Sequence, residues 1–390
     1  MKIAYKHIVN CIDSKPSIEE LSDNLFQLGH EHEISNDIFD MEFTPNRGDC
    51  LSIKGILRDL KLFYDISIDN DIYENDIEQF SFEFNNKAKE ICSNISFLKV
   101  EINEIPLLYK DYLNDFFSDL NIKKNNFFTD VSNYVSYETG QPTHCYDSSK
   151  VNEPIKLDFV KEKAKFETLL DKTIEIDEEN LVFVDKNNEI INLAGVIGGK
   201  YTSCNKKTKS VIIECAHFNP EAILGKSVRY GISSEAAHKF ERNTDLNNHD
   251  YTIRRLLKII EDHAQIQKVE IFSENNYKNK INSIMFDVKK INKILGTSTT
   301  NKDCIIYLQK LGFLIKNDEI LIPSYRNDVK TINDIAEEVA RAIGYNNIKA
   351  QNFDISLKNN SKDAHEEKKL KDLLINEGFY EVINDPFISI

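Results

Sequence analysis

The sequence predicts a multidomain α+β protein, in which a central mixed α+β domain is flanked by two small, related helix-and-strand modules. Three observations support this fold class. The chain has 390 residues, 41% of them hydrophobic, which is enough for several separate cores. The same order of helix, strand, Arg-x-Asp turn and helix occurs twice, with strand-like runs and short helices between the copies. We therefore expect the segments 1–75, 76–275, 276–350 and 351–390.

The first module is expected at 1–75. Ser17-Ile18-Glu19-Glu20 has the pattern of a capping box, and leucines at helical spacing follow it up to Gly29. These features predict a helix over 17–28. The rest of the module is predicted as a strand over Ile38–Phe43, a turn at Pro45–Asp49 and a helix over Leu51–Tyr64.

The second module is expected at 276–350 and repeats this order. A helix over Cys304–Leu311 ends at Gly312, and two short strands follow within Phe313–Pro323. Arg326-Asn327-Asp328 then corresponds to Arg47-Gly48-Asp49 of the first module, and a helix is predicted over Thr331–Ile343. Only two copies, far apart in the sequence, exclude a solenoid and indicate a pair of related modules.

The central segment, 76–275, mixes short strands and short helices, which indicates an α+β domain. The polar run Ser273–Lys280 marks its end. A polar linker begins at 351 and leads to an amphipathic helix over Glu366–Asn376. The strand-like runs of the central segment are Ile95–Ile102, Ile155–Phe159, Leu181–Asp185 and Val211–Cys215, and its helical runs are Pro220–Arg229 and Ser234–Arg242.

Composition limits the possible function. The net charge of −15 and the pI near 5.2 argue against non-specific nucleic-acid binding, so any RNA contact has to come from local patches. The seven cysteines include no C-x-x-C pair, which argues against a zinc site and a secreted disulfide framework. No run approaches the roughly 18 apolar residues that cross a bilayer, and residues 1–7 lack the long apolar run that is typical of a signal peptide. We expect a cytoplasmic protein with reduced thiols and no membrane contact.

Two features of the central segment are candidate site elements. His144 follows the turn Gly140-Gln141-Pro142, where an imidazole suits proton transfer near neutral pH, although such a histidine is more often structural. The run Gly195–Gly199 consists of small residues that turn closely. Its backbone N–H groups either face a ligand or belong only to a tight turn.

Glu214 interrupts the apolar strand Val211–Ala216. A buried carboxylate needs a polar partner in a pocket, unless it lies on an edge that faces solvent. In a pocket it would accept a phenolic hydroxyl and so distinguish tyrosine from phenylalanine. Ser234 could cap the following helix, on which His238 and Arg242 share one face that either meets RNA phosphate or is a solvated surface.

A group of acidic side chains marks the helix predicted over 331–343. They lie opposite its apolar stripe, and oxygen-only ligands suit Mg²⁺. An acidic first turn is also favoured by the helix dipole alone. The residues that could converge on an ion are Asp328, Asp334, Glu337 and Glu338.

Long motifs in the central segment resemble the editing domain of bacterial phenylalanine–tRNA ligase β subunits. They are, in order, DVSNYVSYETGQPTHCYD, LAGVIGGKYTSCN, VIIECAHFNP and RYGISSEAAHKFER. The resemblance continues before them in TPNRGDCLSIKGILRDL, and after them in SYRND and IAEEVARAIGYNNI.

The resemblance implies that residues 131–242 form a site that hydrolyses tyrosine wrongly esterified to tRNA(Phe). His144 would place or activate water, and Glu214 with the backbone of Gly195 to Gly198 would recognise the para-hydroxyl. Ser234, which stands where the family usually has threonine, and Ala236 would line the pocket.

For the whole enzyme, the resemblance implies attachment of phenylalanine to tRNA(Phe) together with an α subunit, in an α₂β₂ assembly. ATP would be bound mainly by the α subunit, and Asp328, Asp334, Glu337 and Glu338 would belong to a magnesium site shared with it. Nothing in the chain resembles the class II adenylation motifs, so its own chemistry would be editing.

The chain departs from the family pattern in two places. Between His32 and Phe39 the family carries an OB-type tRNA-binding domain, and only a few residues are present here. Beyond Gly378–Ile383 the family continues into catalytic-like and anticodon-binding domains, so we expect a truncated β subunit. The alternatives are a degenerate, non-catalytic scaffold that docks the α subunit or RNA, and a free-standing editing factor that acts in trans.

Overall fold

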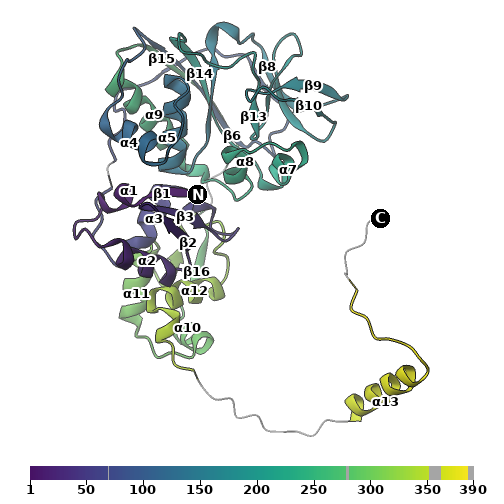
Figure 1. Cartoon of the computed structure of the whole chain (residues 1–390). Helices are drawn as coiled ribbons and strands as arrows, with labels where there is room; N and C mark the ends of the chain where they lie inside the picture. Colours follow the sequence, from purple (N-terminus) through teal and green to yellow (C-terminus); the bar gives the residue numbers. More distant parts are fainter. Residues whose placement is uncertain (69, 278–280, 351–361, 385–390) are drawn as a thin grey trace. The chain divides into compact units, whose positions relative to one another are not determined.

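The computed structural model of the chain describes residues 1–68, 70–277, 281–350 and 362–384 (Figure 1). Residues 1–348 form one compact unit and residues 349–390 a second. The second unit contains helix α13, Lys362–Asn376, where the sequence predicts a helix over Glu366–Asn376. The polar linker expected from 351 falls on residues that the structure does not describe, as does the end of the predicted polar run at 278–280. Within the described ranges, no helix combines the length and apolar character needed to cross a membrane.

The first module contains a three-stranded antiparallel sheet in the order β1-β3-β2. Ser17 accepts a hydrogen bond from the Glu20 N–H and caps helix α2, as the sequence predicts. Helix α3 is shorter than predicted at both ends. Ser52 accepts from the Gly55 N–H and fixes the helix start at Ile53, and the helix ends at Leu60. The elements are β1 Lys2–Ala4, α1 Tyr5–Val9, α2 Ile18–Gln27, β2 Glu31–Ser35, β3 Ile38–Glu42, a 3₁₀ turn Gly48–Cys50 and α3 Ile53–Leu60.

The second module has a sheet of the same size in the order β16-β18-β17, again antiparallel. Its predicted helices and its two short strands are confirmed, and the order of elements repeats that of the first module. The elements are β16 Ser283–Met285, α10 Val288–Leu295, α11 Asn301–Lys310, β17 Leu314–Lys316, β18 Glu319–Leu321, α12 Ile332–Ile343 and a 3₁₀ turn Tyr345–Asn347.

Both modules join two strands by the same dipeptide. Asn36-Asp37 connects β2 to β3, and Asn317-Asp318 connects β17 to β18. The φ angles are 51° and 61° in the first turn and 52° and 61° in the second. Positive φ at both central residues is the mark of a type I′ hairpin turn, and Asn and Asp tolerate it better than other side chains. The first turn lies where the family resemblance places an OB-type domain.

Each module also holds a buried arginine with equivalent partners. The arginine follows the second strand of the hairpin, and it donates to an acid two residues later and to another acid twelve residues later. This common geometry extends the internal repeat from the order of elements to individual side chains. The two sets are Arg47 with Asp49 and Asp59, and Arg326 with Asp328 and Glu338.

Arg341 of α12 joins the two sets into one buried ionic cluster. Its guanidinium donates to Glu338 at 2.7 Å, to Asp59 of the first module, and to the carbonyl of Leu28 at 2.8 Å. Burial alone would raise the pKa of Asp59, but Arg341 and Arg47 outweigh it and hold this pKa well below its usual range. The two modules therefore pack together through paired charges as well as apolar contacts.

The central domain is built on two five-stranded sheets, with the orders β4-β15-β6-β14-β7 and β13-β12-β11-β8-β5. The strands of the first sheet are β4 Glu78–Gln79, β6 Asn94–Ile102, β7 Thr143–Asp147, β14 Ser210–His217 and β15 Ile266–Asn275. Those of the second are β5 Phe84–Asn86, β8 Ile155–Phe159, β11 Leu181–Val184, β12 Ile190–Leu193 and β13 Ile197–Gly198. A two-stranded sheet is formed by β9 Ala164–Glu167 and β10 Thr173–Ile176.

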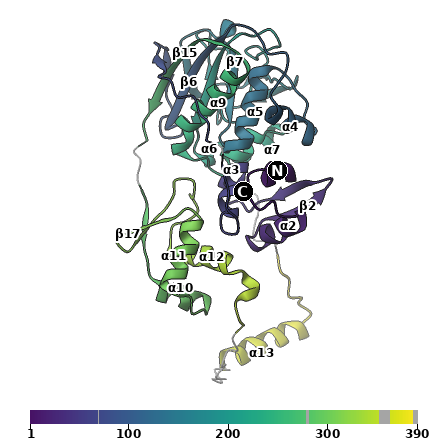
Figure 2. The ribbon, with the colours of Figure 1, turned by 90° about the vertical axis from the view of Figure 1, so that its left-hand side faces the viewer.

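The first sheet is covered differently on its two faces (Figures 1 and 2). Side chains alternate along β14, so Val211 and Ile213 face the helices while Ile212 faces the second sheet. The helical layer consists of α4 Asp111–Asp119, α5 Phe127–Thr139 and α9 His249–His263. The other face packs against the second sheet, so that two sheets enclose one apolar layer.

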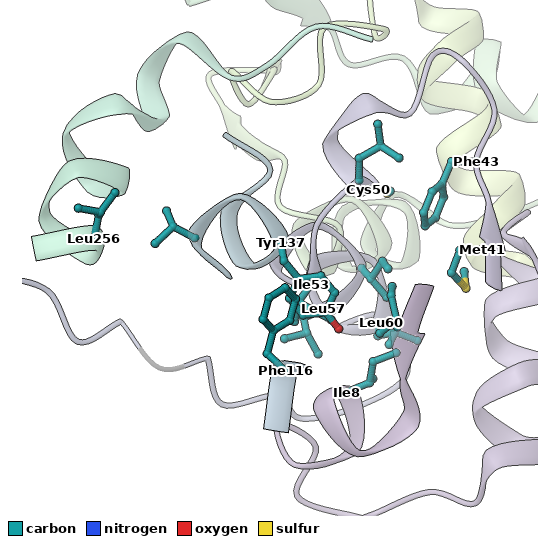
Figure 3. Packing of buried hydrophobic residues seen from close by; sticks show 14 of the residues in the cluster. Ile8, Met41, Phe43, Cys50, Ile53, Leu57, Leu60, Phe116, Tyr137 and Leu256 are labelled. Atoms are coloured by element: carbon teal, nitrogen blue, oxygen red, sulfur yellow. The ribbon is translucent and has the colours of Figure 1, made fainter. Parts of the chain in front are cut away.

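The helical layer shares its core with the first module. Ile53 and Leu57 of α3 belong to the same buried cluster as Phe116 of α4 and Tyr137 of α5, and Figure 3 shows these side chains close up. A continuous core of this kind holds the first module against the central domain.

Between β14 and α9 the chain forms three short helices: α6 Pro220–Ile223, α7 Lys226–Tyr230 and α8 Glu235–Phe240. The single helix predicted over Pro220–Arg229 is wrong. Gly225 has a φ of 75°, in the left-handed region, and it separates α6 from α7. The remaining 3₁₀ turns are Ser148–Lys150 and Leu246–Asn248.

Candidate functional site

His144 and Glu214 occupy directly paired positions on neighbouring antiparallel strands, β7 and β14. Directly paired residues have side chains on the same face of the sheet. Tyr146, two residues after His144, faces the same way. Since β14 lies between β6 and β7, Glu214 is not on a sheet edge, and it points into the layer between the two sheets. Of the two positions that the sequence allowed for Glu214, the structure has the one with a polar partner.

The partners of Glu214 come from two other strands. Its Oε2 accepts hydrogen bonds from the Tyr146 hydroxyl at 2.5 Å and from Asn192 Nδ2, on β12, at 3.2 Å. The Asn192 amide also donates to the Tyr146 hydroxyl at 2.7 Å. Burial raises the pKa of Glu214 to about 7, although both hydrogen bonds act to lower it. This carboxyl therefore changes protonation near neutral pH.

The ring of His144 is held by packing. It meets the Tyr146 ring edge-on, with 4.5 Å between ring centroids, and neither ring nitrogen makes a hydrogen bond to a described residue. A Cβ atom at Gly198 would lie only 2.1 Å from His144 Cε1, so glycine leaves the space that the ring fills. Burial lowers the pKa of His144 to about 4. The imidazole is therefore neutral at neutral pH and able to accept a hydrogen bond from water.

The Gly195–Gly199 run is a hairpin turn between β12 and β13. The N–H of Val196 donates to Leu193 and the N–H of Gly199 donates to Ile191, so these two groups do not face a ligand. Gly195 has a φ of 69° and lies against Ile223 of α6. For these N–H groups, the structure confirms the tight-turn interpretation. Gly198 leaves space in the site for the His144 ring.

Ser234 and Ala236 lie next to this turn. Ser234 caps α8 by accepting from the Ala237 N–H, and its hydroxyl donates to the carbonyl of Val196 at 2.6 Å. Ala236 packs against the apolar layer between the two sheets. The structure thus brings His144, Glu214, Gly195, Gly198, Ser234 and Ala236 into one neighbourhood.

A cavity of about 760 Å³ opens beside Ser234. Apolar side chains, including Phe116 of α4 and Val228 of α7, form much of its wall. Lys239 also lines it, and its buried ammonium donates to the carbonyl and hydroxyl of Ser136 at 2.7 and 2.9 Å. Burial lowers the pKa of Lys239 to about 8. A cavity of this volume has room for a nucleoside with an attached amino acid.

His238 and Arg242 lie side by side, although α8 ends at Phe240, two residues before the predicted end at Arg242. Arg242 Nη1 donates to His238 Nδ1 at 3.0 Å, and His238 lines the cavity beside Ser234. Partial burial and the charge of Arg242 lower the pKa of His238. This face therefore carries a cationic Arg242 beside a histidine that loses its own charge more readily. Its role toward RNA stays a prediction.

The four acidic residues of the expected magnesium site do not converge. Asp328 and Glu338 both accept from Arg326, and Asp334 accepts from the backbone N–H groups of Lys330 and Thr331 in a capping box. Glu337 is exposed. Because the best-placed oxygens already face a guanidinium, these residues do not fit a resident Mg²⁺ within this chain. The helix-cap alternative describes Asp334.

Within the described ranges, one group of three potential ligand side chains lies close enough to hold a metal: His30, Cys50 and Asp59. Arg47 donates to the Cys50 thiol at 2.9 Å and to Asp59 at 3.0 Å. A guanidinium at that position repels a cation, so the group belongs to the ionic cluster between the modules.

Two residues of the site are missing from the predictions. Tyr146 lies in the same motif as His144. Its position two residues further along a strand indicates that both side chains lie on the same face of the sheet. Asn192 is a polar residue within the apolar run Ile190–Leu193, which marks a buried side chain in need of a partner. Neither signal says that the two meet at Glu214, because their strands are distant in the sequence.

Two family models match this chain. The B3/4 domain matches residues 110–265, which include the site, and the tRNA synthetase B5 domain matches residues 284–345, which include α12. The phenylalanine–tRNA ligase β subunit of Ehrlichia ruminantium (strain Gardel) is 30% identical over 388 residues, covering 96% of this chain and 48% of the relative. The chain is a homologue of the phenylalanine–tRNA ligase β subunit.

Other proteins are similar to this chain over most of its length. The β subunits of Idiomarina loihiensis and Rickettsia prowazekii are 29% and 28% identical and are matched over 92% and 91% of this chain. The chain spans about half the length of the curated relatives it matches. A crystal structure of an N-terminal fragment of the β subunit from Pyrococcus horikoshii is matched over 88% of this chain and 99% of the fragment, at 15% identity and a TM-score of 0.48.

Proposed function

We propose that this β-subunit homologue hydrolyses tyrosine esterified to tRNA(Phe), in the site between the two central sheets. The observation that carries this proposal is the pairing of a buried carboxylate, Glu214, with a neutral imidazole, His144, inside the segment that matches the B3/4 domain. A carboxylate recognises a phenolic hydroxyl, and an imidazole holds water beside an ester. We take the editing unit to span 76–275, with the modules 1–75 and 276–350 on either side and 351–390 as a linker and the start of a further domain.

In the proposed reaction, water held by His144 attacks the ester carbonyl carbon. The bond to the ribose oxygen breaks, a proton from the attacking water passes to that oxygen, and tyrosine and free tRNA leave. With a pKa of about 4, His144 is a weak base, so orienting the water is a larger part of its role than storing the proton. Ser234 and Ala236 shape the pocket. The end of the tRNA would approach it from the cavity beside Ser234, which His238 lines and which neither His144 nor Glu214 lines.

The whole enzyme remains a proposal for this chain. By analogy with its relatives, we propose that it supports attachment of phenylalanine to tRNA(Phe) with an α subunit, which binds ATP. The exposed Glu337 is the acidic residue of α12 that is best placed to share a magnesium ion with such a partner, because its carboxylate is not held by Arg326. No step of the editing reaction depends on that ion.

Single-turnover deacylation tests the proposal. The purified chain should deacylate tyrosyl-tRNA(Phe) faster than phenylalanyl-tRNA(Phe), and Glu214→Ala should remove this preference. Glu221→Ala, which changes an exposed glutamate on α6, should keep it and serves as the matched control. Equal rates on both substrates with the folded wild-type chain would contradict tyrosine recognition by Glu214.

The second candidate function is that of a non-catalytic scaffold. Tyr146 already donates to Glu214, so the carboxylate has a partner without any substrate, as expected of a site that binds none. Such a scaffold would bind the α subunit or RNA and deacylate neither substrate. Co-purification with the α subunit that survives both His144→Ala and Glu214→Ala, without any deacylation by the wild type, would favour the scaffold.

A further inference from the structure

We propose that Tyr146 determines the specificity of this site by acting as an internal substitute for the tyrosine substrate, so that the site rejects phenylalanine only weakly. This inference rests on the proposed function and goes beyond it, because it assigns a role to a residue that neither touches the ester nor holds the water.

The geometry points to a carboxylate with one oxygen, Oε2, that is satisfied before any ligand arrives. Tyr146 is completely buried, Asn192 is 3% exposed, and both direct hydrogen atoms at the same oxygen of Glu214. The Asn192 amide donates to the phenol oxygen, so the phenol hydrogen is left to point at the carboxylate. The other oxygen, Oε1, accepts no hydrogen bond from any described residue, and Glu214 is 5% exposed.

This arrangement changes how the site distinguishes the two amino acids. A site rejects a ligand without a hydroxyl when that ligand leaves a buried acceptor unpaired. Here a phenylalanine side chain leaves nothing unpaired on Oε2, because Tyr146 stays in place. A tyrosine substrate has to donate to Oε1 instead of Oε2, or it has to displace the internal phenol. Both effects reduce the preference for tyrosine over phenylalanine.

The same contacts allow an opposite role, which the test separates. Tyr146 could hold the carboxylate so that Oε1 points at the substrate, and removing its hydroxyl would then weaken tyrosine recognition. We favour the substitute role because the Tyr146 hydroxyl already makes the short, charge-assisted bond that a substrate phenol would make.

The test uses two non-hydrolysable probes that bind without requiring catalysis. They are 3′-amino-3′-deoxyadenosine carrying tyrosine through an amide, and its phenylalanine counterpart. Isothermal titration calorimetry on the full chain gives the two dissociation constants, and their ratio measures specificity. Deacylation of the two charged tRNAs gives a second, kinetic ratio for the same variants.

Tyr146→Phe is the decisive variant, because it removes one oxygen atom and keeps the ring. It should raise the preference for the tyrosine probe about tenfold, which is the worth of one hydrogen bond to a buried acceptor. Asn192→Ala leaves the Tyr146 hydroxyl on Glu214 and should keep the ratio within about twofold of wild type. Tyr201→Phe, which alters an exposed tyrosine, should not change it.

Several results would overturn the role proposed for Tyr146. An unchanged or lower ratio in Tyr146→Phe overturns the proposal, and so does an equal rise in Asn192→Ala or Tyr201→Phe. If Tyr146→Phe does not fold, the wild type alone still decides, since a preference for tyrosine above about a hundredfold contradicts a satisfied acceptor. Wild-type deacylation with an unchanged Tyr146→Phe ratio defeats only this inference. A wild type that binds neither probe and deacylates neither tRNA defeats the proposed function as well.

Discussion

At the scale of single residues, Glu214 shows how burial and hydrogen bonding compete. Removal from water raises its pKa, while Tyr146 and Asn192 act in the other direction, and the result is a pKa of about 7. A carboxyl that titrates there is half ionised near neutral pH. The site therefore presents an acceptor whose charge depends on pH within the physiological range.

This raised pKa has a consequence for stability. Between about pH 4.5 and pH 7 the folded chain keeps the proton on Glu214 while the unfolded chain loses it, so this group makes stability fall as pH rises. The fall amounts to about 3 kcal/mol over that window. The Glu214→Gln side chain cannot ionise, so the variant should lack this pH-dependent loss of stability.

Urea unfolding of both proteins at about pH 5 and about pH 8 measures this term, because every other titrating group is common to the two chains. We expect the difference in free energy of unfolding between wild type and Glu214→Gln to move by about 3 kcal/mol in favour of the variant at the higher pH. A difference that stays constant with pH would show that the pKa of Glu214 is not raised.

The candidate site could be predicted from the sequence only in part. A carboxylate within an apolar strand and a histidine after a Gly-x-Pro turn each stand out locally, and Ser234 caps its helix as expected. The partners of Glu214 could not be predicted, because they depend on the register of β7 against β14 and on the packing of a second sheet. These long-range features leave no periodic signal in the chain.

At the scale of elements, the two hairpins of the flanking modules require the same backbone conformation in their turns. All four turn residues have positive φ, which costs an ordinary side chain about 1 kcal/mol and costs glycine nothing. Asparagine and aspartate are intermediate. The turn chemistry explains why a two-residue connection is sufficient between β2 and β3.

Asp37 offers a direct test of this turn. We expect Asp37→Ala to lower the free energy of unfolding by about 1 kcal/mol relative to Asp37→Gly, because alanine brings a Cβ into the left-handed region. The same pair of substitutions at Asp318 should give the same order. Chemical denaturation of the four variants measures it, and an alanine variant as stable as the glycine variant at either position would argue against a type I′ turn there.

The order of elements was the most predictable part of the fold. Capping residues, apolar periodicity and glycine stops act over a few residues, and they place α2, β8 and α12 within a residue of their observed bounds. The error at Pro220–Arg229 came from treating Gly225 as part of a helix. The acidic residues of α12 were expected to converge on an ion. The sequence does not show that Arg326, from the preceding turn, donates to Glu338.

At the scale of the whole compact unit, the ionic cluster between the modules connects segments about 280 residues apart. Asp59 accepts from Arg47 and from Arg341, whose sequence separation from Asp59 is 282 residues. A buried carboxylate with one guanidinium removed is costly, because water cannot replace the lost partner. The free energy of unfolding should therefore depend on Arg341 far more than on any exposed ion pair.

Arg341→Met keeps much of the side-chain volume and removes the charge. We expect it to lower the free energy of unfolding by about 3 kcal/mol. Arg229→Met removes an arginine that pairs with Asp177 at an exposed position, and it should cost less than about 1 kcal/mol. Thermal and urea unfolding of both variants compare the two costs. Equal losses would mean that the cluster does not hold the modules together.

The central claim is that this chain carries a working editing site, and hydrolysis of tyrosyl-tRNA(Phe) by the purified chain tests it most directly. We expect measurable single-turnover deacylation by the wild type. The rate should fall at least about tenfold in Gly198→Ala, whose added methyl group occupies the space of the His144 ring. A wild type without activity, or a Gly198→Ala variant as fast as the wild type, would contradict it.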